Sequence, residues 1–283
     1  MSDERLDLVD AVLYGDVFDC AVTLDEAWRY ARVAIGRDEL ARRLRDDPLV
    51  VENGGLYCLA GREELLERRP ERMRHAARLE RRARRVARVL RHFPFVRGLA
   101  LTGSAAAGDA GEEDDVDLIM TVAEGRLGTV FLLLASLSRL VGRRLFCPNY
   151  YVCENRLGLG PANLYLAREL AQSRMLVGDG AALWRGNPWL EQTFPNAEPP
   201  VGVRPAGARL QQALETLVGG RLEPWARRVA RRRLRAHYGA VPADVEDAFA
   251  AGAALRFHGS GVAARTLERH HARRVELDHE HAA

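Results

Sequence analysis

The sequence predicts an α+β protein rich in helix, with a small N-terminal domain, a central domain built on a small mixed sheet and a helical C-terminal region. Three observations lead to this fold class. Apolar residues recur at helical spacing over most of the 283 residues. Two strand-like apolar runs, Leu99–Leu101 and Asp117–Met120, flank one short loop near the middle of the chain. A segment rich in proline and glycine, 197–207, separates this region from the last helices.

The first region, residues 1–62, is predicted to hold three helices followed by a β-hairpin. The helices cover Leu6–Phe18, Thr23–Tyr30 and Gly36–Arg45. Thr23-Leu-Asp-Glu26 is a capping box, in which the Thr hydroxyl and the Glu carboxylate satisfy free backbone N–H groups. Asn53-Gly54 supplies the positive φ that a tight turn needs between strands at 49–52 and 56–60.

Three helices followed by a hairpin is the order of a winged helix, so we expect a winged-helix-like N-terminal domain. In one interpretation the arginines of helix 36–45 enter a DNA groove and the hairpin lies beside it. In the other, the domain packs on its neighbour or on another protein. Acidic residues dilute the arginines and favour packing: Asp38, Glu39, Asp46 and Asp47.

Residues 63–94 are predicted to form a long connecting helix over Glu63–His92, which Pro94 stops. Arginines crowd one side of it: Arg74, Arg78, Arg81, Arg82, Arg84, Arg85, Arg88 and Arg91. A second basic patch covers 227–235. Such arginine-rich helices contact RNA or DNA phosphates in some proteins. A solvated face paired with neighbouring acids is the alternative.

The remaining elements divide into a central region, 95–196, and a C-terminal region, 197–283. In the central region we expect helices at Leu127–Val141, Ala162–Leu176 and Ala181–Phe194, and a third strand at Arg144–Val152. In the C-terminal region we expect helices at Ala208–His237, Asp244–His258 and Val262–Leu277.

The loop between the two central strands carries the clearest chemistry. Gly103-Ser104 ends the first strand, and Asp115-Val-Asp117 opens the second. Residues i and i+2 of a strand share a face, so both carboxylates would point the same way, about 7 Å apart. They would repel each other unless a cation lay between them, and such oxygen ligands suit Mg²⁺. The Gly-Ser turn adds N–H groups and a hydroxyl where a phosphate could approach.

Gly103-Ser104, a gap and Asp115-x-Asp117 between apolar strands resemble the signature of the polymerase-β-like nucleotidyltransferase superfamily, over roughly 95–155. The resemblance implies a minimal nucleotidyltransferase domain in which the Gly-Ser turn holds an NTP triphosphate. It also implies that Asp115 and Asp117 are catalytic and bind two Mg²⁺ ions. A third acid on a later strand would activate the acceptor.

The chain departs from this family pattern at the third acid, because the expected strand RLFCPNYYV contains none. Asn149 is at a plausible facing position, but a neutral amide cannot act as a general base and is a poorer Mg²⁺ ligand than a carboxylate. Glu154 lies just past the strand. Glu169 on the following helix, and Asp109 or Asp114 in the loop, are further candidates.

The composition limits the class of protein, its location and the nucleophiles available to it. The hydrophobic fraction of 47% and the charged fraction of 29% are typical of a globular protein, and Leu127–Val141 is too short for a membrane span and contains Arg139. The acidic start lacks an apolar signal region, and the four cysteines lack C-x-x-C spacing, so we expect a cytoplasmic protein with reduced thiols. All 42 basic side chains are arginine, which excludes a lysine nucleophile.

The sequence therefore predicts an enzyme that moves an NMP from ATP or another NTP to RNA, a protein or a small molecule, with release of pyrophosphate. The alternative is a regulatory module that binds nucleic acid or protein and senses NTP through a degenerate nucleotidyltransferase domain. The missing third acid favours the alternative, and the intact Gly-Ser and Asp-x-Asp motifs favour the enzyme.

Overall fold

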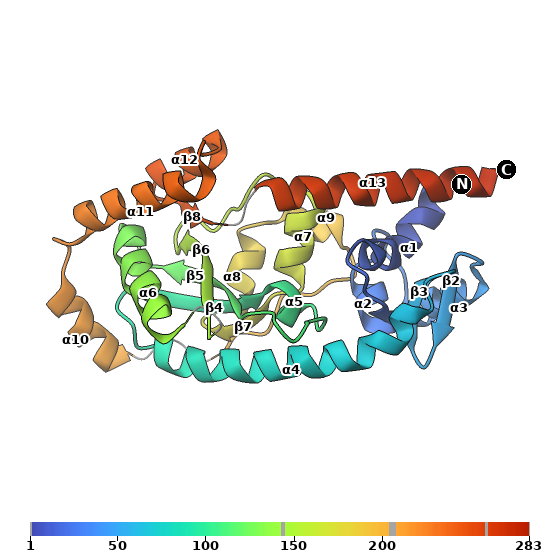
Figure 1. Ribbon diagram of the computed structural model, residues 1–283, viewed down its shortest axis with the longest axis horizontal. Helices are drawn as coiled ribbons and strands as arrows, with labels where there is room; N and C mark the ends of the chain where they lie inside the picture. Colours follow the sequence, from blue (N-terminus) through green and yellow to red (C-terminus); the bar gives the residue numbers. More distant parts are fainter. Residues whose placement is uncertain (1, 143–144, 204–207, 258–259, 283) are drawn as a thin grey trace.

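The computed structural model describes residues 2–142, 145–203, 208–257 and 260–282 and shows a mixed α/β protein (Figure 1). A five-stranded sheet is built mainly from the middle of the chain, and a smaller three-stranded sheet lies with the first helices at one end. Helices α4 (Glu64–Leu90) and α13 (Ser260–Ala282) run along opposite sides of the molecule and reach that end. None of the described helices is long and apolar enough to cross a membrane.

The N-terminal part confirms the three expected helices, the hairpin and the capping box. Its elements are α1 (Ser2–Val17), β1 (Val22–Thr23), α2 (Leu24–Arg29), α3 (Arg37–Asp46), β2 (Val50–Asn53) and β3 (Leu56–Leu59). The Thr23 hydroxyl accepts a hydrogen bond from the Glu26 N–H at 3.2 Å, and the Glu26 carboxylate accepts one from the Thr23 N–H at 2.8 Å. Strand β1, which pairs antiparallel with β3, is not among the elements predicted from the sequence.

Helix α4 confirms the long connecting helix and joins the two sheets. Its buried side chains, among them Leu79, Val86 and Leu90, pack under the central sheet. Near its start Arg69 is also buried, at 2% exposure. Its guanidinium donates to Glu26 on α2 at 2.6 Å and pairs with Asp109 at 3.2 Å. This charge network ties the N-terminal helices to the loop that follows the Gly-Ser turn.

The central sheet has the strand order β7-β4-β5-β6-β8. Its strands are β4 (Val96–Thr102), β5 (Asp117–Val122), β6 (Cys147–Cys153), β7 (Arg174–Val177) and β8 (Ala254–Arg256). Neighbours run antiparallel except β5 and β6, which are parallel because helix α6 (Leu127–Val141) crosses over between them. The mixed sheet predicted from the sequence is therefore confirmed.

Two edge strands correct the sequence analysis. The expected helix at 162–176 ends early: α7 covers Leu164–Ala171, and the following residues form β7. The expected helix at 244–258 likewise stops at α12 (Ala243–Ala250), and β8 follows. Short apolar runs of this length fit a helix end or a buried strand equally well, and pairing with β4 and β6 decides between them.

Alternation along β5 gives the sheet two differently covered faces. Leu118, Met120 and Val122 pack with α4, α6 and α11 (Glu223–Tyr238). Ile119 faces the other way and packs with α7 and with α8 and α9, the two short helices that replace the single one expected at 181–194. These are α8 (Gly180–Arg185) and α9 (Trp189–Thr193).

The C-terminal region is helical, as predicted, but its first helix is broken. The expected helix 208–237 is two helices, α10 (Ala208–Val218) and α11, separated at Gly219, whose φ of +58° lies in the left-handed region. Helix α13 returns to the N-terminal helices, where Arg274 donates to Asp7 at 2.7 Å and to Asp10 at 3.0 Å. The N-terminal part is thus held from both sides, by α4 and by α13 (Figure 1).

Candidate functional site

The two sequence motifs meet at one edge of the central sheet. Gly103 and Ser104 follow β4 directly and open the short helix α5 (Gly103–Ala106). Asp117 is the first residue of β5 and pairs with Thr102, the last residue of β4. The antiparallel register therefore places the Gly-Ser turn beside the aspartates, as the sequence analysis expected.

Gly103 is in close contact with Asp117. Its φ is +66°, and a Cβ added there would lie 2.6 Å from Asp117 Oδ2. A side chain at 103 would thus be strained and would collide with the carboxylate. The Gly103 N–H donates to Glu169 Oε2 at 3.3 Å, so two carboxylates lie against this one backbone position.

A third ligand atom joins the two aspartates. Because β6 runs parallel to β5 and pairs with it, Cys147 lies opposite Asp117. One ligand atom each of Asp115, Asp117 and Cys147 lie within 4.8 Å of one another, and all three residues are partly exposed. These distances are short enough for the three groups to share one ion.

The donor chemistry fits Mg²⁺ only in part. The carboxylates of Asp115 and Asp117 are hard oxygen ligands of the kind Mg²⁺ takes. The Cys147 thiol is a soft ligand that suits zinc and other transition metals better. The structure therefore offers two suitable ligands for one Mg²⁺ ion, and a thiol where the resemblance implies an acid.

Glu169 is the carboxylate that the sequence could not single out. It lies on α7, whose Ala167, Leu170 and Ala171 are buried, and it accepts from Gln172 Nε2 at 3.0 Å as well as from Gly103. The sequence signal was an acid on a helix whose other residues are mostly apolar. Packing of that helix on the sheet face of Ile119 brings the acid to the site.

The structure places two of the other third-acid candidates, Glu154 and Asp109, in ion pairs away from the cluster. The prediction of Glu154 as the third acid is wrong. Glu154 follows the end of β6, whereas the cluster lies at its start, and it pairs with Arg97 at 3.6 Å. Asp109 is buried in ion pairs with Arg69 and Arg72. Asp114 accepts from the Gly111 N–H at 3.0 Å within the loop. The backbone of Asn149 belongs to β6, but its side chain lies outside the described residues.

Burial and crowding of charge shift the titration of this site. Burial, then repulsion from Asp115 and Glu169, raises the pKa of Asp117 to about 8. Burial also raises the pKa of Glu169 to about 7, against the opposing effect of the Gly103 N–H. Both carboxyl groups thus hold protons at a pH where exposed acids are ionised, which is the condition that a cation would relieve.

This shift predicts a pH-dependent stability. A pKa raised to about 8 from 3.8 means that the folded protein holds the Asp117 proton more tightly than the unfolded chain. The resulting stabilisation is complete below about pH 4 and is lost as the pH rises through about 8. Asp117→Asn should therefore lose less stability than the wild type between about pH 5 and 8.5, measured by urea unfolding.

A cation should act on the same group. We expect Mg²⁺ to raise the midpoint of wild-type unfolding more at about pH 8.5 than at pH 5, and to have little effect on the Asn variant. Glu113→Gln, an exposed acid in the same loop, is the control and should behave like the wild type. Equal pH slopes for the wild type and Asp117→Asn would contradict the assignment.

A cavity of about 270 Å³ lies next to Glu169, on the face of the sheet that carries Ile119. It is mostly apolar and is closed on one side by the start of α13. Its wall includes Thr102, Ile119, Tyr150, Tyr165, Glu169 and Ala264. A small group bound there would lie against the Glu169 carboxylate.

The fold and the site define a mixed α/β protein with a glycine turn and an acidic cluster at one edge of its sheet. In comparisons with known proteins, no family model, no curated protein and no solved structure matches the chain. The function is therefore argued from the site itself.

Proposed function

We propose that the protein is a metal-dependent nucleotidyltransferase of the polymerase-β-like kind, with a winged-helix-like N-terminal domain. The observation that carries the proposal is the contact between the Gly103 backbone and the Asp117 carboxylate, with Asp115 beside it. A phosphate bound by the Gly-Ser turn would lie directly against a pair of carboxylates whose oxygens suit a cation. Enzymes that transfer phosphoryl or nucleotidyl groups use this combination of a phosphate site and metal-binding carboxylates.

The proposal gives each group a role. The N–H groups of Gly103 and Ser104, with the Ser104 hydroxyl, bind the terminal phosphates of an NTP. Asp115 and Asp117 would hold Mg²⁺, which when bound neutralises charge on the transferred and leaving oxygens. The family resemblance implies two ions, and the described ligands are close enough together to hold one of them.

Glu169 is the proposed general base. Its pKa of about 7 is well matched to accepting a proton near neutral pH. The acceptor hydroxyl gives its proton to the Glu169 carboxylate, its oxygen bonds to the α-phosphorus, and the bond from that phosphorus to pyrophosphate breaks. The triphosphate would replace Glu169 as the partner of the Gly103 N–H, which frees the carboxylate for this step.

The arginines of α4 favour RNA as the acceptor. Arg74, Arg78, Arg81, Arg85 and Arg88 are exposed and alternate at spacings of four and three, so they form one stripe along the helix. None of the five forms an ion pair with another described residue. By contrast, two arginines of α3 are paired with an acid of their own helix, since Arg42 pairs with Glu39 at 2.7 Å and Arg43 with the same acid at 2.8 Å. We therefore propose that α4, rather than α3, contacts nucleic acid.

The test is pyrophosphate release with each of the four NTPs and Mg²⁺, with and without bulk tRNA. The proposal expects release with at least one NTP and a higher rate with tRNA. If RNA docks on α4, changing Arg78, Arg81 and Arg85 together to Gln should remove the stimulation by tRNA and leave the basal rate unchanged. Changing the paired Arg42 and Arg43 to Gln is the matched control and should not affect the stimulation.

One observation favours the alternative function. A thiol at the third ligand position weakens a magnesium site, and such a site suits a regulatory module that binds NTP without turning it over. Saturable NTP binding with no pyrophosphate release under any of these conditions would support that alternative and overturn the enzyme.

The Gly-Ser turn gives a prediction with a matched control in the chain. Gly125 has a φ of +67°, almost the same as Gly103, but an added Cβ there meets nothing within 4 Å. Gly125→Ala should cost about 1–2 kcal/mol of stability and leave activity intact. Gly103→Ala should in addition abolish pyrophosphate release, because its methyl group displaces the Asp117 carboxylate. Equal activity in both variants, compared at equal folded fraction, would contradict the role of Gly103.

A further inference from the structure

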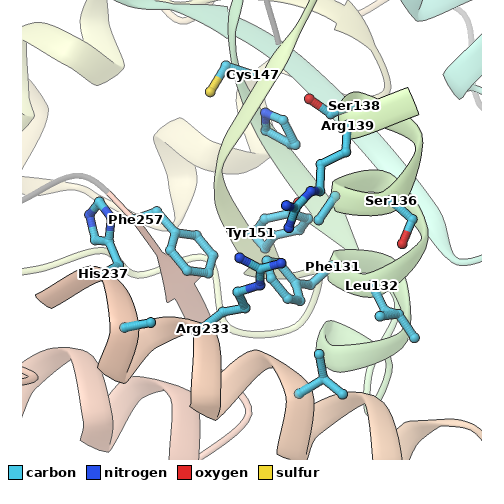
Figure 2. Close-up of a pocket in the computed structure, with 14 residues that line it drawn as sticks. Phe131, Leu132, Ser136, Ser138, Arg139, Cys147, Tyr151, Arg233, His237 and Phe257 are labelled. Carbon is cyan, nitrogen blue, oxygen red and sulfur yellow. The ribbon is translucent and has the colours of Figure 1, made fainter. Parts of the chain in front are cut away.

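A larger cavity, of about 390 Å³, lies on the opposite face of the sheet from Glu169. Figure 2 shows the residues that line it. Its walls come from α6, β6, α11 and Phe257, which follows β8. Cys147 at its rim is the only lining residue that also belongs to the acidic cluster. The volume is within the range of cavities that take small organic ligands.

The two helical walls are held in fixed positions. The buried Glu223 carboxylate at the start of α11 accepts hydrogen bonds from the Gly128 and Thr129 N–H groups of α6, at 3.0 and 2.8 Å. A Cβ at Gly128 would lie 2.6 Å from the Arg227 nitrogen, so the helices touch there through their backbones. The cavity is therefore a defined space between anchored helices.

Aromatic rings form the floor. The Phe131 and Phe257 rings stack with centroids 5.1 Å apart and planes 21° apart. The Tyr151 ring meets Phe131 edge-on at 5.8 Å. Phe131 is only 6% exposed, so the half-buried ring of Phe257 offers the aromatic face on which another planar ring can stack.

Two arginines face each other across the cavity. Arg139 comes from α6 and Arg233 from α11, and Figure 2 shows their guanidinium groups pointing toward one another near Tyr151. Both are exposed, and neither forms an ion pair with any residue that the structure describes. Their neighbour Arg231 does, with Glu246 at 3.0 Å. Two converging positive charges without an acid between them are suited to bind an anion.

Tyr151 adds a buried polar group. Its side chain is fully buried, at 0% exposure, and its hydroxyl makes no hydrogen bond with any described group. A buried hydroxyl without a partner is costly, and Tyr151 lines this cavity.

We propose that this cavity is a binding site for an aromatic phosphate monoester, with the ring on Phe257 and the phosphate between Arg139 and Arg233. Two guanidinium groups match the charge of a phosphate dianion better than that of a single carboxylate. Nucleoside monophosphates and aryl phosphates share this chemistry. The site lies on the other face of the sheet from Glu169, so it does not depend on the proposed transfer reaction.

The test is equilibrium binding by calorimetry, in EDTA, to the full-length protein. The probes are phenyl phosphate and the four nucleoside monophosphates, with inorganic phosphate and phenol as the two halves of the ligand. We expect at least one complete probe to bind at least about tenfold more tightly than either half. Tighter binding of a nucleotide than of phenyl phosphate would identify the ring as a base, and the reverse would identify an aryl phosphate.

Substitutions test whether Arg139 and Arg233 bind the phosphate. Arg139→Gln and Arg233→Gln should each weaken binding by about tenfold, since each removes a charge-assisted hydrogen bond. Arg235→Gln, an exposed arginine of α11 outside the cavity, is the matched control and should bind like the wild type. Tyr151→Phe should bind like the wild type and keep the midpoint of thermal unfolding, because the lost hydroxyl is buried and has no hydrogen-bond partner among the described groups.

The proposal is overturned if no complete probe binds more tightly than inorganic phosphate, or if both arginine variants keep wild-type affinity. Asp117→Asn is measured in parallel. Binding retained in that variant, together with absent pyrophosphate release in the wild type, would show that the nucleotidyltransferase proposal fails while this site stands.

Discussion

Asp117→Asn is expected to lower Mg²⁺-dependent pyrophosphate release by a factor of at least about 10²–10³. Asn keeps the size of the side chain and one oxygen but removes the charge that balances a cation. The cluster then has a single carboxylate, Asp115, and the soft thiol of Cys147. The measurement is the steady-state rate of pyrophosphate release at saturating NTP and Mg²⁺.

The loss should not come from unfolding. Repulsion from Asp115 and Glu169 contributes to the raised pKa of Asp117, so removing its charge relieves strain in the folded state above about pH 8. The variant should therefore be at least as stable as the wild type at that pH. Glu113→Gln, an exposed acid of the same loop, should keep full activity. Retained activity in Asp117→Asn would contradict the assignment of Asp117 as a ligand of the catalytic cation.

Arg69→Met is expected to lower the free energy of unfolding by about 3–5 kcal/mol. The guanidinium of Arg69 is buried between Glu26 at 2.6 Å and Asp109 at 3.2 Å, and it donates to the Ala107 carbonyl at 3.3 Å. Met fills a similar volume but leaves these acceptors without the charge that compensates their burial. Urea unfolding would measure the loss, and the free energy of unfolding should fall with urea concentration at the same slope in the variant as in the wild type.

An exposed ion pair on the same helix provides the control. Arg84 donates to Glu80 at 2.6 Å, a distance as short as that from Arg69 to Glu26, but its side chain is more than half exposed. Arg84→Met should cost less than about 1 kcal/mol, because solvent screens such pairs. Equal losses in the two variants would show that burial does not set the strength of the Arg69 network.

The sequence alone predicts the parts of this fold that depend on neighbouring residues. The capping box at Thr23, the hairpin around Asn53-Gly54 and helix Leu127–Val141 are all found where expected. Each depends on hydrogen bonds or apolar spacing within a few residues, and such interactions are encoded locally. The aspartate pair and the Gly-Ser turn were predicted for the same reason, since both are short motifs at strand ends.

Contacts between distant residues decided the rest. Cys147 faces Asp117 because β6 pairs with β5 in one parallel register, and Glu169 reaches Gly103 because α7 packs on the sheet. Strands β7 and β8 exist because β4 and β6 offer them open edges. The cavity between Arg139 and Arg233 exists because α11 is anchored on α6.

The sequence by itself thus determined the helices and hairpin of the N-terminal part, the two strands that flank the Gly-Ser loop and which two aspartates belong together. The tertiary structure decided which thiol and which glutamate complete that cluster. It also decided which arginines face each other across the cavity on the other face of the sheet. The physical reason is that strand register and helix packing are set by the whole core. No local pattern of side chains specifies them.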